Sequence, residues 1–258
     1  MKKTILIMLI LVLSATMVFA QGKKEEKSGY VFASDATWPP LEFVENGQLT
    51  GFEVELMPLI GEKVGVAMTV KNIPWDTIFA GLANGAYDGV ASGVTVTEER
   101  KATMDFSTPI MVITQAILAP IADTSLSNTA SLNGKVVGVQ LGTTGHIFLD
   151  DFMKKNPSFK ATIKAYDEIG FAIEDMLNGN LQAVVTDSVI ASDFVLSNPN
   201  YASKLKVAGS ASDLGDPEPI AIAMLKGNTE VLDLVNNGLK QIEASGKMAE
   251  LKKKWNIL

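Results

Sequence analysis

Residues 88–101 read DGVASGVTVTEERK, and the order of residue types in this stretch decides the fold. Asp88–Gly93 is a short apolar run, which predicts a buried β-strand. Thr97 then begins a helical turn. A buried strand that runs directly into a helical turn is typical of α/β proteins.

The segment between the strand and the turn has the chemistry of an anion site. Ser92–Thr95 offers hydroxyl groups and unpaired backbone N–H groups, and Arg100 follows within the helical turn. A planar guanidinium can hold a carboxylate through two parallel hydrogen bonds. The alternative is a surface arginine that pairs with Glu98 or Glu99, which is the commoner role for an arginine.

On both sides of this stretch, apolar β-branched runs alternate with amphipathic helical segments. The predicted strands are Tyr30–Ser34, Met68–Asn72, Asp88–Gly93, Gln115–Ala119, Val136–Val139, Ala161–Ala165, Ala183–Thr186 and Ile220–Met224. The predicted helices are Glu53–Val64, Thr77–Asn84, Thr97–Ala102, Gly145–Lys155, Ile169–Asn178, Ser188–Ser197, Thr229–Ala244 and Lys247–Trp255. This alternation predicts an α/β fold with largely parallel sheets.

Two sets of elements in a chain of this length predict two lobes rather than one large sheet. Lobe 1 is expected to be discontinuous, with residues 30–112 and 210–258, and lobe 2 is expected to hold residues 113–209. The segment Ala208–Pro219 contains several Gly and Pro residues, so it is expected to cross between the lobes rather than to form a helix.

The first twenty residues predict a cleavable secretory signal. Lys2 and Lys3 supply its positive region, the apolar run Ile5–Phe19 follows, and cleavage is expected between Ala20 and Gln21. The alternative is a retained membrane anchor, but the run is about fifteen residues long whereas a spanning helix needs roughly twenty. No Cys follows the run, which excludes a lipid on an N-terminal cysteine.

Removal of the signal leaves 238 residues, of which 21–28 (QGKKEEKS) are expected to form a charged leader. The composition of this remaining chain excludes several classes of function. Without Lys2 and Lys3, 20 basic residues face 29 acidic ones, so the charge is about −9 and nucleic acid is not an expected partner. The absence of Cys excludes disulfides, thiolate metal sites and a Cys nucleophile. A lone His146 excludes a metal site with several His ligands, and neither a metal nor a cofactor is expected.

Further segments lie where predicted strands end, which is where ligands bind in such folds. Trp38 and Trp75 each follow a strand, although either could be a core residue. Gly142–Gly145 (GTTG) leads into a helix whose first N–H groups favour an anion. Asp187 ends a strand, where it could accept hydrogen bonds from an ammonium group or could cap the next helix.

Together these segments resemble the periplasmic amino-acid-binding proteins of ABC importers, the family 3 extracellular solute-binding proteins. The resemblance runs from about Tyr30 to the end, and Tyr87–Phe106 (YDGVASGVTVTEERKATMDF) carries it most specifically. Supporting motifs are Gly51–Leu56 (GFEVEL), Val136–Thr144 (VVGVQLGTT) and Gly246–Trp255 (GKMAELKKKW). The resemblance implies the two-lobed periplasmic binding protein fold (type II), in which two hinge segments join lobes that close on a ligand.

The resemblance also implies eleven ligand-binding residues. The contacts expected from lobe 1 are Arg100 with the ligand's α-carboxylate, Ser92, Gly93 and Thr95 beside it, and Trp38 and Trp75 against the ligand's side chain. The contacts expected from lobe 2 are Thr143 and Thr144 with the carboxylate and Asp187 with the α-ammonium. Asp35 and Gln140 fall where selectivity for the ligand's side chain is often set.

Three segments depart from the family's pattern. Leu41 replaces a Phe, Ile110-Met111 replace tyrosines near the first hinge, and Gln182 replaces an Asp. The first two changes are expected to alter the shape of the pocket.

The resemblance implies an exported, periplasmic, monomeric protein that captures a polar amino acid and delivers it to the membrane permease subunits of an ABC importer. Asp35 and the tryptophan ring faces favour a cationic or amide-bearing amino acid. Two alternatives remain open. One is an exported cyclohexadienyl dehydratase on the same fold, for which only Glu42 and His146 are available as general acids. The other is a sensor module for a separate membrane receptor.

Overall fold

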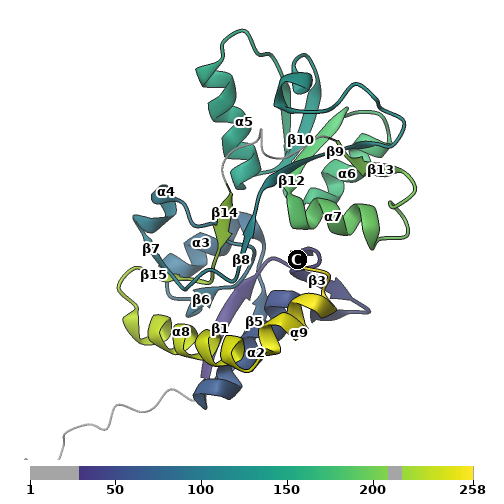
Figure 1. The fold of residues 1–258 in the computed structure, drawn as a ribbon. Helices are drawn as coiled ribbons and strands as arrows, with labels where there is room; N and C mark the ends of the chain where they lie inside the picture. The colour runs from purple at the N-terminus through teal and green to yellow at the C-terminus, as the bar shows by residue number, and fades with distance from the viewer. Residues whose placement is uncertain (1–28, 209–216, 258) are drawn as a thin grey trace, which may run out of the picture.

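Two five-stranded sheets, each with its own helices, form two lobes joined by a narrow connection (Figure 1). The computed structural model describes residues 29–208 and 217–257. The predicted signal and charged leader, residues 1–28, lie outside the described residues, as does most of the predicted crossing segment. Among the described residues, no helix combines the length and the apolar character needed to cross a membrane.

The sheet of lobe 1 draws strands from both ends of the chain. In spatial order its strands are β5 (Ala67–Asn72), β1 (Gly29–Ser34), β6 (Gly89–Val90), β15 (Ala223–Leu225) and β7 (Met104–Phe106). β1 pairs in parallel with β5 and β6, whereas β15 is antiparallel to β6 and β7. The helices of this lobe are α2 (Phe52–Val64), α3 (Trp75–Ala83), α4 (Glu98–Lys101), α8 (Thr229–Ala244) and α9 (Lys247–Lys254). The C-terminal helices therefore complete a lobe that begins at the N-terminal side of the chain (Figure 1).

The sheet of lobe 2 has the same mixture of parallel and antiparallel pairing. Its strands, in spatial order, are β11 (Thr162–Tyr166), β10 (Val136–Gln140), β12 (Ala183–Asp187), β9 (Gln115–Pro120) and β13 (Leu205–Val207). β10 is parallel to β11 and β12, and β9 is antiparallel to β12 and β13. The helices of this lobe are α5 (Thr144–Lys155), α6 (Ile169–Leu177), α7 (Ser188–Leu196) and the 3-10 turn η1 (Thr129–Leu132).

Two antiparallel strands form the hinge between the lobes. β8 (Met111–Ile113) leads into β9 of lobe 2, and β14 (Glu218–Ile220) leads back to β15 of lobe 1. Glu218 is opposite Ile113 in this pairing. The predicted division of the chain after residue 112 falls within β8, and the lobe boundaries themselves stay a prediction.

The predicted alternation of strands and helices is confirmed, with two differences of extent. The strand predicted over Asp88–Gly93 pairs only at Gly89–Val90, and the chain then turns at Gly93, whose φ of 52° cannot continue an extended strand. The single strand predicted over Ile220–Met224 is divided between β14 and β15 because the chain leaves the hinge between them.

Short strands were missed. A small sheet follows β1 and contains β2 (Thr37–Trp38), β3 (Glu42–Glu45) and β4 (Gln48–Thr50). These strands, together with β7, β8 and β13, are four residues or fewer, which is too short to show a period in the sequence. β2 and β3 bear on the site because they carry Trp38, which lines the pocket, and Glu42, which accepts a hydrogen bond from Ser92.

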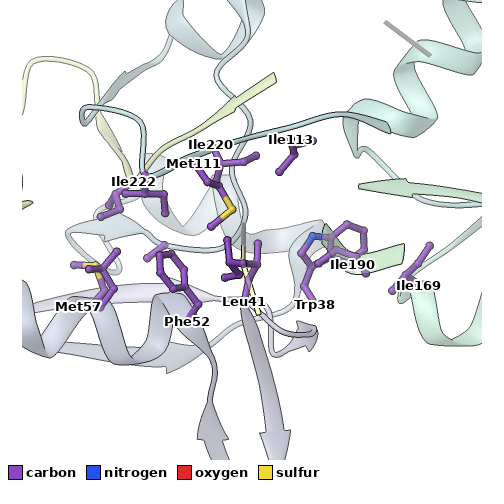
Figure 2. Packing of buried hydrophobic residues seen from close by; sticks show 14 of the residues in the cluster. Trp38, Leu41, Phe52, Met57, Met111, Ile113, Ile169, Ile190, Ile220 and Ile222 are labelled. Carbon is purple, nitrogen blue, oxygen red and sulfur yellow. The ribbon is translucent and has the colours of Figure 1, made fainter. Parts of the chain in front are cut away.

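One apolar cluster runs from lobe 1 through the hinge into lobe 2 (Figure 2). Phe52 of α2 lies at its lobe 1 end, and Met111 and Ile220 contribute from the two hinge strands. Figure 2 shows Trp38 on the side of the cluster toward Ile190 of lobe 2. Continuous apolar packing of this kind fixes the strand ends that carry polar groups.

Helices α2 and α8 of lobe 1 approach closely at Gly238. A Cβ atom at Gly238 would lie 2.6 Å from Cγ2 of Ile60 and 3.0 Å from its carbonyl oxygen. Ile60 is fully buried, so it has no free space to move into. The packing of the two helices therefore requires a glycine at this position.

We expect Gly238→Ala to lower the free energy of unfolding by about 1–2 kcal/mol, because overpacking outweighs the gain in helix propensity of about 1 kcal/mol. The measurement is the shift of the urea unfolding midpoint, followed by circular dichroism. Gly170→Ala in α6 is the matched control, since no neighbouring atom lies within 4 Å of its added Cβ, and it should be neutral or stabilising. Equal midpoints for the two variants would contradict this account of the α2–α8 contact.

Candidate functional site

A pocket of about 310 Å³, counting the open space at its mouth, is lined by residues of both lobes. The structure brings all eleven predicted site residues to its wall. They are Asp35, Trp38, Trp75, Ser92, Gly93, Thr95, Arg100, Gln140, Thr143, Thr144 and Asp187. Their contact with a ligand stays a prediction.

The lobe 1 wall is built on the loops that follow β1 and β6. The hydroxyl of Ser92 accepts a hydrogen bond from the backbone N–H of Asp35 (2.8 Å) and donates to Oε1 of Glu42 (3.0 Å). The backbone N–H of Gly93 donates to Oε2 of Glu53 (3.1 Å). Two acidic side chains behind the pocket thus fix the loop that faces it.

Glu42 and Glu53 are both almost completely buried. Burial raises the pKa of Glu53 to about 8, and burial together with the charge of Glu53 raises the pKa of Glu42 well above its usual range. Within the described part of the chain, Oε2 of Glu42 and Oε1 of Glu53 have no hydrogen-bond partner. The pair therefore holds at least one proton at neutral pH, and each carboxyl has an oxygen free to carry it.

The local structure around Arg100 differs from that of an ordinary surface arginine. Thr97 caps the helical turn by accepting from the backbone N–H of Arg100 (3.1 Å). Glu98 forms an ion pair with Lys101 (2.7 Å) instead of with Arg100. Nη1 of Arg100 donates to the carbonyl oxygen of Thr95 (3.0 Å), which turns the guanidinium toward the pocket.

The guanidinium of Arg100 lies between lobes and over aromatic rings. Its central carbon is 5.4 Å from the ring centre of Trp75 and 5.2 Å from that of Phe79. Nη2 reaches across to the carbonyl oxygen of Gly142 in lobe 2 (3.4 Å). Burial lowers the pKa of Arg100, while the nearby carboxylate of Asp187 raises it. Two of the five N–H groups of the guanidinium have these partners, which leaves others for an anion.

Asp187 occupies the N-cap position of α7, but its side chain makes no capping hydrogen bond. Its Oδ1 accepts from Nε2 of Gln115 (2.8 Å), and the carboxylate also accepts from Trp38 of lobe 1. Burial raises the pKa of Asp187 to about 7, and these hydrogen bonds act in the opposite direction. Of the two roles left open, the structure therefore favours a carboxylate directed toward the pocket over a cap.

The two threonines at the start of α5 point in different directions. The hydroxyl of Thr143 donates to the carbonyl oxygen of Gln140 (2.9 Å), so it closes the turn and does not cap the helix. The hydroxyl of Thr144 donates to Oε2 of Glu218 (2.6 Å).

A second contact between the lobes lies on another part of the wall. Nε2 of Gln140, at the end of β10, donates to Oδ2 of Asp35 (3.1 Å). Both side chains are buried, and burial raises the pKa of Asp35 to about 6. The amide of Gln140 and the carboxyl of Asp35 therefore lie together, and a positive charge placed beside them would favour the ionised form of Asp35.

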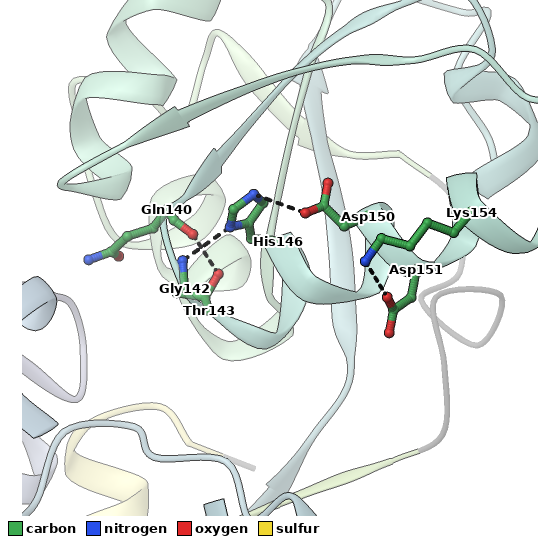
Figure 3. Close-up of polar contacts among 7 residues, drawn as sticks. All are labelled: Gln140, Gly142, Thr143, His146, Asp150, Asp151 and Lys154. Carbon is green, nitrogen blue, oxygen red and sulfur yellow. Dashed lines mark hydrogen bonds and ion pairs between the residues drawn. The ribbon is translucent and has the colours of Figure 1, made fainter. Parts of the chain in front are cut away.

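The general acids required by the dehydratase alternative are engaged elsewhere. Glu42 lies behind the Ser92 hydroxyl, as described above. Nδ1 of His146 accepts from the backbone N–H of Gly142 (3.1 Å), and Nε2 lies 3.7 Å from Asp150 (Figure 3). Neither side chain is part of the pocket wall. Among the described residues, no three His, Asp or Glu side chains are grouped to hold a metal ion.

Sequence reasoning missed Gln115 and Glu218, which adjoin the pocket from the hinge side. Gln115 begins β9 and is almost fully buried, and Glu218 begins β14. The signal available for Gln115 was a single polar residue at the start of an apolar run. Glu218 lies in the turn-rich segment before Ile220, where the sequence has no periodicity to indicate which side chains point inward.

The residues that depart from the family's pattern do not themselves line the pocket, and their effect on its shape stays a prediction. Leu41, Ile110 and Met111 are buried in the apolar cluster, and none of them is part of the pocket wall. Oε1 of Gln182 accepts from the backbone N–H of Val136 (2.8 Å) and so stabilises the edge of β10. These residues therefore contribute to core packing and to strand contacts.

Comparison with known proteins places this geometry in context. Residues 30–257 match the model of the bacterial extracellular solute-binding proteins, family 3. The chain is 31% identical over 228 residues to the probable histidine-binding protein of Neisseria gonorrhoeae, covering 88% of this chain and 82% of that protein.

Two solved structures are similar over nearly the whole chain. One is an ancestral arginine-binding protein bound to arginine, with 34% identity, a TM-score of 0.81, and coverage of 89% of this chain and 98% of that one. The other is the arginine-, lysine-, histidine-binding protein ArtJ of Geobacillus stearothermophilus, with 35% identity, a TM-score of 0.80, and coverage of 88% and 94%.

The Glu42–Glu53 pair makes stability depend on pH. The pKa of Glu53 is about 8 in the folded protein and near its ordinary value of 4.5 in the unfolded chain. Between these values only the folded state keeps the proton, so stability falls as pH rises. Glu53→Gln should make the slope of unfolding free energy against pH shallower by about 1.4 kcal/mol per unit between pH 5 and 8.

Urea unfolding at pH 5, 6, 7 and 8 measures this slope. Glu62→Gln, at an exposed position of the same helix, is the control and should keep the parent's slope. A Glu53→Gln variant that lost stability with pH as steeply as the parent would show that Glu53 is not the group that holds the proton.

Proposed function

Because this chain belongs to the bacterial extracellular solute-binding proteins of family 3, we propose that its pocket binds a single amino acid by both of its charged groups. Arg100 of lobe 1 holds the α-carboxylate, and Asp187 of lobe 2 accepts hydrogen bonds from the α-ammonium. The observation that carries this proposal is that a guanidinium and a carboxylate from opposite lobes line one pocket. The protein acts by binding and is not an enzyme.

The two charges explain why binding and closure are linked. A zwitterion loses its hydration on entering the pocket, and that loss is costly unless both charges meet hydrogen-bonded partners. Arg100 and Asp187 meet them only when the lobes are together. The ligand therefore makes contacts in the closed arrangement that an open arrangement lacks, and this difference in affinity shifts the equilibrium toward closure.

The remaining wall favours a cationic amino acid. Arg100 is the only positively charged side chain on the described wall, against the carboxyls of Asp35 and Asp187. After Arg100 and Asp187 have bound the zwitterion, Asp35 is left to balance a positive side chain, with the faces of Trp38 and Trp75 as further partners. The names of the similar proteins, which bind arginine, lysine or histidine, support the same class. Gln140 also allows an amide-bearing side chain.

The proposal extends to location and transport. The predicted signal at residues 1–20 and the extracellular family support a periplasmic location for the mature protein. There it binds its amino acid as a monomer and delivers it to the membrane permease subunits of an ABC importer. Recognition of the closed form by the importer would couple delivery to occupancy of the pocket.

A thermal-shift screen over the twenty amino acids tests the ligand class. Arginine, lysine or histidine should give the largest stabilisation, with glutamine smaller, and aspartate and glutamate should give none. Arg100→Ala should keep the melting temperature of the ligand-free protein but lose at least about 30-fold in affinity, since removal of one partner of a desolvated charge pair costs about 2–5 kcal/mol. Lys101→Ala, its exposed neighbour, is the control.

Stabilisation by acidic amino acids alone would refute the ligand class. Calorimetry showing that Arg100→Ala binds within about threefold of the parent would refute the site.

The pKa of Asp187, about 7, makes binding depend on pH. An ammonium group favours the ionised carboxylate, so binding at pH 7 should release part of a proton, and affinity should fall as pH falls through 7. Titration calorimetry with L-arginine in phosphate and in Tris measures the release, because the two buffers differ in ionisation enthalpy. Asp187→Asn should bind weakly with less release, and identical enthalpies for the parent in both buffers would contradict the raised pKa of Asp187 in the ligand-free protein.

A further inference from the structure

One carboxylate of the hinge, that of Glu218, contacts residues of both lobes at the edge of the pocket. Glu218 is the first residue of β14, and its Oε2 accepts from the hydroxyl of Thr144 in lobe 2 (2.6 Å) and from that of Thr95 in lobe 1 (3.2 Å). The two hydroxyl oxygens lie 3.4 Å apart. One oxygen atom of Glu218 thus touches a residue of each lobe.

Gln115, at the start of β9, extends this contact to Asp187. Its Nε2 lies 3.4 Å from each carboxylate oxygen of Glu218, 3.1 Å from the hydroxyl of Thr144 and 2.8 Å from Oδ1 of Asp187. The amide therefore lies among the acceptors of Glu218 and Asp187. The proposed ammonium contact and the hinge belong to one hydrogen-bond network.

We propose that Glu218 is a positioning residue that holds the two lobes together in the closed arrangement and orients the hydroxyls of Thr95 and Thr144 beside the bound amino acid. This inference rests on the proposed function of the pocket. Under this proposal, Glu218 of the hinge lengthens the lifetime of the complex with the bound amino acid.

Geometry makes the effect specific to the closed arrangement. Thr95 and Thr144 belong to different lobes, so opening separates them and breaks at least one of their bonds to Glu218. Hydrogen bonds to an ionised carboxylate are stronger than those between neutral groups. An interaction present in one arrangement and absent in the other shifts the equilibrium by its full difference in free energy. Loss of Glu218 should therefore speed opening and release without slowing entry.

A different role would give the opposite result. The charge of Glu218 also acts on Arg100 and Asp187. If its main effect were to repel the α-carboxylate of the ligand, neutralising it would strengthen binding. Glu218→Gln separates the two roles because its amide oxygen still accepts from the threonine hydroxyls whereas its charge is gone.

Stopped-flow fluorescence with L-arginine, and with L-histidine as a second probe, measures both rate constants, since Trp38 and Trp75 line the pocket. Glu218→Ala should raise the dissociation rate about tenfold and leave the association rate within about threefold of the parent. Glu218→Gln should dissociate at an intermediate rate. Glu243→Ala removes an exposed carboxylate from α8 and is the control for net charge.

A double-mutant cycle tests whether Glu218 acts through Thr144. In a Thr144→Val background, Glu218→Ala should change the dissociation rate by no more than about twofold. Fully multiplicative effects, or a Glu218→Ala variant that dissociates at the parent's rate, would overturn the inference, as would tighter binding by Glu218→Gln. If the parent binds neither probe, the proposed cationic ligand fails and this inference falls with it; if the parent binds, only the role of Glu218 is at stake.

Discussion

The closed arrangement of the two lobes depends on how the buried guanidinium of Arg100 is accommodated between them. Desolvation is unfavourable for this charge, and it lowers the pKa of the group. The protein compensates with the carbonyl oxygen of Thr95, the ring faces of Trp75 and Phe79, and the charge of Asp187 from the other lobe. Because one of these partners belongs to lobe 2, the charge of Arg100 is best accommodated when the lobes meet. The charges that line the pocket therefore also favour the arrangement in which the two lobes meet.

The core supports this arrangement by fixing the loops that carry the polar groups. Gly93 leaves the strand with a positive φ, and its backbone N–H is held by the buried carboxyl of Glu53. A Cβ at Gly93 would lie 3.1 Å from Trp38, so the glycine also lets the ring lie against the loop. Buried acids are costly unless they are protonated or hydrogen-bonded. Glu42 and Glu53 each accept a hydrogen bond, and the pair holds at least one proton. Glu42 and Glu53 thus hold the loop behind the pocket, although neither side chain lines the pocket.

Strand order in the sequence predicted Asp187, and the family resemblance added Gln140. Both residues end parallel strands, and the carboxyl ends of such strands meet at one edge of a sheet. Gln115 and Glu218 could not be predicted in this way, because β9 runs antiparallel to β12 and β14 pairs antiparallel with β8 in the hinge. Their approach to the pocket depends on how the two hinge strands align, and three-residue strands carry no pattern that reveals such an alignment.

The residues that local pattern cannot predict are those through which the lobes influence each other. A strand-end residue such as Asp187 belongs to one lobe and is positioned by that lobe's sheet. Glu218 belongs to the connection, so its hydrogen bonds to Thr95 and Thr144 exist only as a consequence of the relative placement of the lobes. Binding determinants are therefore encoded within each lobe, whereas the stability of the closed arrangement is encoded in the hinge. Differences in affinity between relatives with the same pocket wall can then arise from hinge residues alone, since any group that contacts both lobes changes the balance between open and closed states.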